Sequence, residues 1–161
     1  MVKGKSKIAI IGAGFVGATT AYTIATNHLA QEIALIDVNR DKARGEAMDI
    51  SHGLCHMGQM EVYEGDYSAC SDCDIIIVTA GLNRKPGETR LDLAKRNVPI
   101  ARDITENIMK HYTRGVILVV SNPVDVLTYC IQKWSGLPVG RVMGTGTALD
   151  SSRFRTLVSE R

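Results

Sequence analysis

A short apolar stretch followed by three closely spaced glycines constrains the fold of this chain more than any other feature. Residues 8–11 read Ile-Ala-Ile-Ile, which is typical of a buried strand. Gly12, Gly14 and Gly17 follow with the spacing G-x-G-x-x-G. Apolar residues then recur at helical intervals, at Val16, Ala21, Tyr22, Ala25 and Leu29. The glycines therefore occupy a turn from a strand into a helix, the context in which this motif binds a dinucleotide.

Each glycine has its own mechanical role in such a turn. Gly12 permits the tight bend, Gly14 lets the backbone approach a pyrophosphate, and Gly17 lets the helix pack closely on its strand. The start of the helix also offers unpaired N–H groups and a partial positive charge to phosphates. The motif alone is a weak signal, so the next strand has to carry part of the argument.

The second apolar run supplies an acidic residue in the expected place. Residues 32–36 read as another buried strand, and Asp37 follows it about 20 residues after Gly17. A carboxylate here accepts hydrogen bonds from the adenosine ribose and repels a 2′-phosphate, which favours NAD over NADP. Two alternatives stay open. Asp37 could be a helix cap or turn residue, and the basic residues Arg40 and Lys42 nearby would suit NADP.

Composition places the chain among ordinary globular domains. Its 161 residues are 45% hydrophobic and 22% charged, which suits one domain with a sizeable core. The net charge of +2, without a basic run that alternates with aromatics, argues against nucleic acid. Residues 1–7 are too short and polar for a signal peptide, and no apolar stretch approaches a membrane span. We therefore expect a soluble, cytoplasmic protein with no membrane partner.

The four cysteines do not indicate a metal site. Cys70 and Cys73 have the C-x-x-C spacing, but no second Cys or His pair completes a zinc site. The pair also precedes a strand, whereas a redox motif would open a helix after one. With Cys55 and Cys130, they are predicted to be reduced structural thiols and not metal ligands.

Strands and helices alternate through the rest of the chain. Further strands are expected at residues 60–63, 74–80, 116–120 and 141–144. Helices are expected at residues 41–51, 91–112 with an interruption near Pro99, 124–134 and 149–161, with a loop at 52–58. Near-continuous apolar strands predict a doubly wound α/β fold, a parallel sheet of about six strands covered by helices on both faces. Ligands then bind beyond the carboxyl ends of the strands.

Four motifs together resemble those of the L-lactate and malate dehydrogenases. They are Gly12–Gly17, Gly87–Leu93, Ser121–Asp125 and Gly144–Arg155. The similarity extends over essentially the whole chain. It implies a Rossmann-type domain that binds NAD, and hydride transfer between the nicotinamide and C2 of a small 2-oxo or 2-hydroxy acid. It also implies a homo-oligomer in the full-length protein.

The resemblance assigns roles to four polar residues. Arg90, on a mobile loop over residues 82–90, would polarise the substrate carbonyl, and Arg153 would bind the substrate carboxylate as a two-pronged fork. Asp150 would orient a catalytic histidine, and Asn122 would lie near the nicotinamide and substrate. From the residues alone, Arg90 could equally be a surface cation and Arg153 an ion-pair partner. Asp150 could be a helix cap and Asn122 a turn residue.

The resemblance also implies a set of cofactor contacts. The matching positions are Gly12, Gly14, Phe15, Val16, Gly17, Asp37, Lys42, Tyr67, Thr79, Ala80, Gly81, Leu82, Val120, Ser121, Asn122 and Thr145. Lys42 and Tyr67 would lie near the adenosine, and Val120 and Thr145 near the nicotinamide. Arg155 matches a position that binds fructose 1,6-bisphosphate in allosteric bacterial lactate dehydrogenases.

The substrate signals conflict at one position. Lactate enzymes usually carry glutamine where this chain has Arg84, and malate enzymes carry arginine, because a buried second carboxylate needs a charged partner. Glu88, Thr89 and residues 91–93 nevertheless resemble the lactate branch. Lactate dehydrogenase is therefore favoured, with malate dehydrogenase as the alternative.

The family's catalytic histidine has no counterpart within these residues. In the family it lies well beyond the position of Asp150. The histidines of this sequence do not stand in a matching context; they are His28, His52, His56 and His111. We expect residues 1–145 to form the NAD-binding domain and residues 146–161 to begin the substrate domain, whose remainder is absent. The chain as given is then expected to bind NAD weakly without turning over 2-oxo acids. A stand-alone, non-catalytic NAD-binding module is the alternative.

Overall fold

The computed structural model describes residues 6–160, apart from the side chains of residues 56 and 57, and contains a six-stranded sheet. The predictions that concern residues 1–5 and Arg161 lie outside this range. The strands are β1 (Lys7–Ile11), β2 (Glu32–Ile36), β3 (Glu61–Glu64), β4 (Ile75–Val78), β5 (Val116–Val119) and β6 (Val142–Gly144). All neighbours pair in parallel, in the order β3-β2-β1-β4-β5-β6. The predicted doubly wound α/β fold is confirmed.

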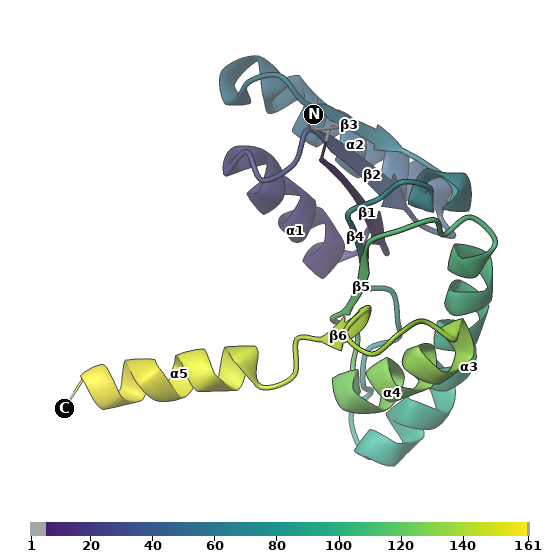
Figure 1. The fold of residues 1–161 in the computed structure, drawn as a ribbon. Coiled ribbons are helices and arrows are strands. Elements are labelled where there is room, and N and C mark those ends of the chain that lie inside the picture. The colour runs from purple at the N-terminus through teal and green to yellow at the C-terminus, as the bar shows by residue number, and fades with distance from the viewer. Residues whose placement is uncertain (1–5, 161) are drawn as a thin grey trace.

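Helices cover both faces of the sheet (Figure 1). They are α1 (Phe15–Thr26), α2 (Arg40–Met57), α3 (Arg90–Met109), α4 (Val124–Ser135) and α5 (Ala148–Ser159), with a short 3-10 helix, η1 (Tyr67–Cys70). Helices α1 and α2 pack on one face, and α3 and α4 on the other. Helix α5 follows β6 and projects away from the sheet (Figure 1).

Alternation along the strands divides the core into two layers. In β1, Ile8 and Ile10 pack with α1 and α2, whereas Ala9 and Ile11 pack with α3 and α4. This follows from the two-residue period of a strand, which points successive side chains to opposite faces. The sheet is therefore apolar on both sides, as its near-continuous apolar runs predict.

Helix α2 is longer than predicted. It continues through residues 52–57, where polar residues and Gly53 predicted a loop, and it ends at Gly58 with a φ of +105°. Leu54 explains the extension, because its side chain packs against the α1/α2 layer. The helix thus stops at a glycine that can adopt the positive φ of a C-terminal cap.

Helix α3 is not interrupted at Pro99, so that prediction was wrong. Proline removes one backbone N–H from the helix, a loss that burial on either side of it can offset. Pro99 itself is exposed, while Val98 and Ile100 pack against the core.

The predicted apolar face of α1 is only partly correct. Ala21 and Ala25 are buried, but Val16, Tyr22 and Leu29 are exposed. Gly17 and Ala21 instead allow the helix to lie close to the sheet, since small residues permit close backbone approach. Ile24 of α1 is buried in the core beside the two alanines, whereas the apolar side chains of Phe15, Val16 and Tyr22 are exposed.

The two cysteines of the C-x-x-C pair are free and belong to the α3/α4 layer. Burial raises the pKa of the Cys70 thiol to about 12 and that of Cys73 to about 11. Both therefore remain protonated and pack as small apolar groups. Among residues 6–160, no three His, Cys, Asp or Glu side chains gather as a metal site, and no helix is both long and apolar enough to cross a membrane.

Candidate functional site

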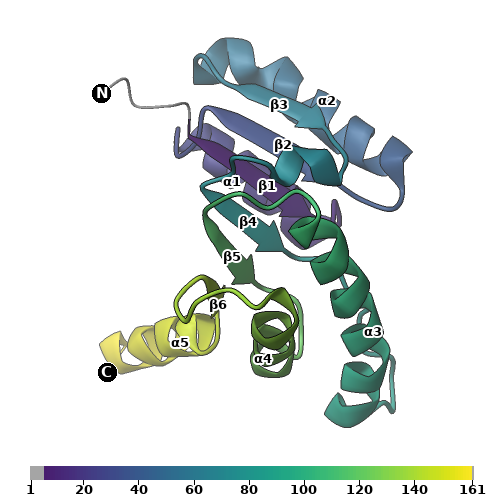
Figure 2. The same ribbon diagram turned by 45° about the vertical axis from the view of Figure 1, so that its right-hand side comes forward.

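The candidate site lies at the carboxyl ends of the strands, all of which point the same way in Figure 2. The chain order reverses on either side of β1, whose neighbours are β2 and β4. In open parallel sheets the crevice at such a switch point is where ligands bind. The turn between β1 and α1, which holds the three glycines, lies directly at this point.

The three glycines meet different surroundings. Gly12 has a φ of +105°, and a Cβ on it would lie 2.6 Å from the Ala80 backbone nitrogen. A Cβ on Gly17 would lie 1.8 Å from the Gly12 carbonyl oxygen. Nothing lies within 4 Å of the position that a Cβ on Gly14 would occupy. Gly12 and Gly17 are thus required by packing, whereas Gly14 leaves open space where a phosphate can approach the backbone.

The beginning of α1 is available to an anion. Its N-cap is Gly14, which has no side chain to bond the first N–H groups, and its first turn carries no acidic residue. The Thr79 hydroxyl stabilises the turn, because its Oγ1 donates a hydrogen bond to the Gly12 carbonyl oxygen at 2.9 Å. The unpaired N–H groups and the partial positive charge of a helix start are what a pyrophosphate requires.

Asp37 lies against the glycine turn. Its Oδ2 accepts the Ala13 N–H at 2.7 Å, and its Oδ1 accepts the Asn39 N–H at 2.9 Å. Asn39 caps α2 by accepting the Lys42 N–H, so Asp37 is not the helix cap. Arg40 pairs with Glu64 at 2.8 Å. The carboxylate thus faces the turn that would hold the phosphates, which is where an acidic residue that binds the ribose of NAD is expected.

Of the remaining predicted cofactor residues, Lys42 lies on α2, and the others follow the ends of β3, β4, β5 and β6. Lys42 is exposed, with its Nζ 5.9 Å from the centre of the exposed Phe15 ring. Burial raises the pKa of Tyr67, the first residue of η1, to about 12. Ser121 is buried, and its hydroxyl donates to the Ala80 carbonyl oxygen at 2.7 Å. The other positions extend these strands at the same edge: Gly81, Leu82, Val120, Asn122 and Thr145.

Asn97 is a site residue that sequence reasoning missed. It lies in the middle of α3, is 2% exposed, and bonds to the loops after β4 and β5. Its neighbours in sequence, Arg96 and Val98, give no sign of this role. Only the packing of α3 under both loops reveals it.

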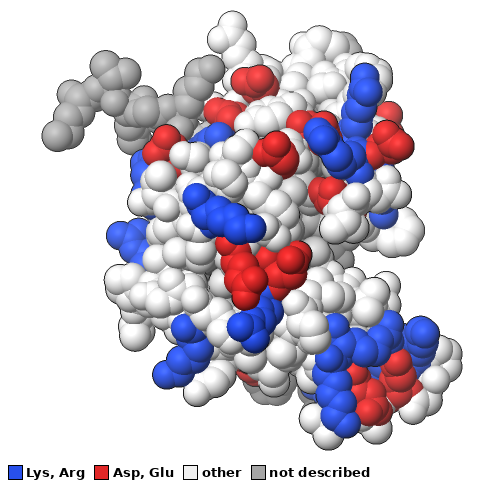
Figure 3. Space-filling model, turned by 90° about the vertical axis from the view of Figure 1, so that its right-hand side faces the viewer, with Lys and Arg blue, Asp and Glu red and all other residues white. Residues whose placement is uncertain are grey.

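The segment 82–89 carries the predicted loop. Arg84, within it, and Arg90, the first residue of α3, are both exposed. Glu88 accepts the Lys85 N–H at 2.8 Å and pairs with Arg96 at 2.6 Å, and these two contacts lower the pKa of its carboxyl. On the face in Figure 3, basic and acidic side chains are interspersed. Glu88 thus links the segment 82–89 to α3, whereas the side chains of Arg84 and Arg90 stay exposed.

Helix α5 holds three of the predicted residues away from this edge. All its described residues are exposed, and Asp150 pairs with Arg153 at 3.0 Å. The two residues therefore contact each other and not another predicted site residue. Arg155 lies on the same exposed helix.

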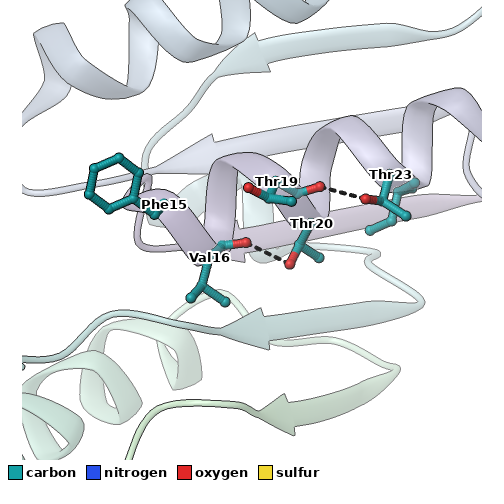
Figure 4. A pocket seen from close by; sticks show the side chains of 6 residues that line it. Phe15, Val16, Thr19, Thr20 and Thr23 are labelled. Atoms are coloured by element: carbon teal, nitrogen blue, oxygen red, sulfur yellow. Dashed lines mark hydrogen bonds between the residues drawn. The ribbon is translucent and has the colours of Figure 1, made fainter. Parts of the chain in front are cut away.

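An apolar hollow of about 480 Å³ runs along the outer side of α1 (Figure 4). Two of its threonine hydroxyls bond to the helix backbone, Thr20 to the Val16 carbonyl and Thr23 to that of Thr19, at 2.7 Å each. The hollow begins at Phe15 and Val16, directly after Gly14, and therefore adjoins the glycine turn.

Comparisons with known proteins agree with this geometry. Residues 6–144 match the family model of the lactate/malate dehydrogenase NAD-binding domain. An L-lactate dehydrogenase of Thermoanaerobacter pseudethanolicus is 58% identical over 155 residues, which are 96% of this chain and 50% of that protein. The chain thus spans about half the length of the curated relatives that it matches.

Solved structures give the same result. The minor L-lactate dehydrogenase from Enterococcus mundtii matches with a TM-score of 0.93 and 46% identity, over 98% of this chain and 50% of that one. The malate dehydrogenase from Archaeoglobus fulgidus, in complex with NADH, matches with a TM-score of 0.91 and 44% identity, over 96% and 53%. The predicted family and the predicted cofactor, NAD, are confirmed. The chain belongs to the lactate/malate dehydrogenase family and carries its NAD-binding domain.

Proposed function

We propose that the full-length protein is an NAD-dependent L-lactate dehydrogenase that interconverts pyruvate and L-lactate in the cytoplasm. The observation that carries this proposal is the 58% identity to an L-lactate dehydrogenase across nearly the whole chain. The open space at Gly14 and the uncapped start of α1 support binding of the NAD pyrophosphate. Asp37, beside the same turn, supports a preference for NAD over NADP.

The proposed chemistry divides among a few side chains. NAD supplies or accepts the hydride when bound. Arg90 stabilises the negative charge that develops on the substrate carbonyl oxygen, and Asn122 orients the substrate beside it. Arg153 binds the substrate carboxylate through both guanidinium nitrogens. Asp150 orients the histidine that exchanges the proton, which belongs to the proposed second domain.

We place the domain boundary near residue 145, so that residues 146–161 belong to the substrate domain. The family match over residues 6–144 and the projection of α5 from the sheet support this division. Residues 1–161 alone are then expected to bind NADH without reducing 2-oxo acids. The full-length protein is expected to be a homo-oligomer.

Malate dehydrogenase is the second candidate, and Arg84 is the observation that favours it. Its guanidinium is exposed on the loop that leads to Arg90. A second carboxylate, as in oxaloacetate, would pair with this charge, whereas the methyl group of pyruvate would leave it unpaired.

The two candidates are separated by kcat/KM of the full-length protein with NADH and either pyruvate or oxaloacetate. We expect the wild type to prefer pyruvate, and Arg84→Gln to raise that preference about tenfold or more. Lys85→Gln is the matched control, because it removes the neighbouring exposed cation. Preference of the wild type for oxaloacetate, lost in Arg84→Gln alone, would establish the malate enzyme instead.

A further inference from the structure

The side-chain amide of Asn97 joins two loops at the candidate site. Its Oδ1 accepts the Leu82 N–H at 2.8 Å, and its Nδ2 donates to the Leu82 carbonyl oxygen at 3.1 Å and to the Asn122 carbonyl oxygen at 2.7 Å. Leu82 follows β4, and Asn122 follows β5. One planar amide therefore fixes the spacing between the loop that carries Arg84 and the loop that carries Asn122.

The surroundings of Asn97 leave it little freedom. Its side chain is buried, and a Cβ on Gly81 would lie only 3.3 Å from its Nδ2. The chain thus runs directly over the amide, and both N–H bonds of Nδ2 are used. A second anchor holds the other end of the loop, since Thr89 and Asp92 form a reciprocal cap at the start of α3. Both ends of residues 83–88 are therefore fixed on α3.

We propose that Asn97 is a positioning residue for the reaction: it fixes the segment 82–89, which carries Arg84 and leads to Arg90, relative to Asn122. The role rests on the proposed function. Its side-chain amide bonds to the backbone of Leu82 and Asn122, so it would act through these two residues. A displacement of about 1 Å in a group that stabilises the transition state can cost on the order of 10²-fold in rate.

The test compares the full-length wild type with Asn97→Leu and Thr105→Val. Thr105 is the matched control, because it is also buried on α3 and its hydroxyl bonds only to Ala101 within the helix. The first readout is hydrogen exchange of the Leu82 amide, which needs no activity. The second is kcat and KM for the 2-oxo acid beside the NADH dissociation constant.

We expect Asn97→Leu to speed hydrogen exchange of the Leu82 amide by about tenfold or more, because this amide loses its hydrogen-bond acceptor, Asn97 Oδ1. The same change is expected to lower kcat/KM by about 10²-fold and to weaken NADH binding by a smaller factor, because Leu82 and Asn122 are only two of the proposed cofactor contacts, and Asp37 and the glycine turn are untouched. Thr105→Val is expected to leave exchange at Leu82 and kcat/KM within about twofold of the wild type.

Equal effects of the two substitutions on Leu82 exchange or on kcat/KM would overturn the proposal. If Asn97→Leu does not fold, Asn97→Asp replaces it. This variant keeps the shape but loses both N–H donors, and unchanged kcat/KM in it would equally overturn the role. Absence of turnover in the wild type would refute the proposed reaction, while exchange at Leu82 still decides whether Asn97 holds the loop.

Discussion

Two glycines of the first turn have opposite sensitivities to an added methyl group, and substitution can separate folding from binding there. Gly17→Ala would place a Cβ against the Gly12 carbonyl oxygen, which belongs to the backbone and cannot give way. We expect it to destabilise the fold by about 3 kcal/mol or more. Gly14→Ala meets only open space at an ordinary φ of −74°, so its stability should fall by only about 1 kcal/mol or less, the cost of alanine at an N-cap.

The same methyl group at Gly14 would stand where the phosphates approach. We therefore expect Gly14→Ala to weaken NADH binding at least about tenfold, or about 1.4 kcal/mol. Urea unfolding and NADH fluorescence titration measure the two effects. Wild-type affinity in Gly14→Ala would contradict the placement of the pyrophosphate at this turn.

Single residues were predictable where a motif fixes their surroundings. Gly12 and Gly17 are closely packed in the turn and Asp37 bonds to it, because a strand, a tight turn and a helix leave few alternatives, while the contact of Asp37 with the ribose stays a prediction. Asn97 was not predictable, since its partners are 15 and 25 residues away in sequence and are reached through backbone atoms. Backbone contacts leave no pattern in the side chains.

At the scale of elements, the junction of the 82–89 segment and α3 is sensitive to acid. The Lys85 N–H and Arg96 lower the pKa of Glu88, and the Thr89 hydroxyl and N–H lower that of Asp92. A carboxyl group whose pKa is lowered in the folded state keeps its stabilising contacts at pH values above its ordinary pKa. It loses them as the pH falls through its folded-state pKa. The loop should therefore stay anchored at neutral pH and loosen in acid.

An NMR titration of the Lys85 amide measures this effect for Glu88. We expect its chemical shift to change with a midpoint below the ordinary glutamate pKa, and this titration to vanish in Glu88→Gln. Glu106→Gln is the control, because Glu106 pairs with Arg102 farther along α3 and does not contact the loop. A midpoint at or above the ordinary value would show that Glu88 does not hold the loop.

Element types were predictable from apolar runs and helical periodicity, but some boundaries were not. The polar residues of 52–57 look like a loop, yet Leu54 gains burial by extending α2. Pro99 looks like a break, yet α3 continues through it, because the packing of Val98 and Ile100 on the core offsets the cost of the proline. In both cases packing on the sheet outweighs local preference.

For the whole molecule, the exposed apolar side chains predict self-association of residues 1–161 when they are produced alone. These side chains lie on the outer side of α1 and along α5, and include Val16, Tyr22, Phe154 and Leu157. Because apolar patches favour contact with other surfaces, we expect the sedimentation coefficient to rise with concentration.

Substitution of Phe154 and Leu157 together by serine should reduce this rise. Val139→Ser is the control, because Val139 is 98% exposed and lies outside α1 and α5. A sedimentation coefficient that does not depend on concentration in the unsubstituted chain would show that these faces do not associate.

The doubly wound parallel sheet could be anticipated from sequence, because parallel apolar strands joined by helices have few arrangements. The contacts of α5 could not, since all its described side chains are exposed and nothing in its pattern names a partner surface.

The two bonds that Asp37 accepts from Ala13 and Asn39 have a consequence for how its variants are interpreted. The carboxylate is already held by two backbone N–H groups, so the ribose that we propose binds there would meet a rigid acceptor, and little side-chain entropy would be lost on contact. Removal of that carboxylate releases the glycine turn as well. The affinity lost in an alanine variant therefore exceeds the strength of the bonds to the ribose, by the amount that the turn relaxes.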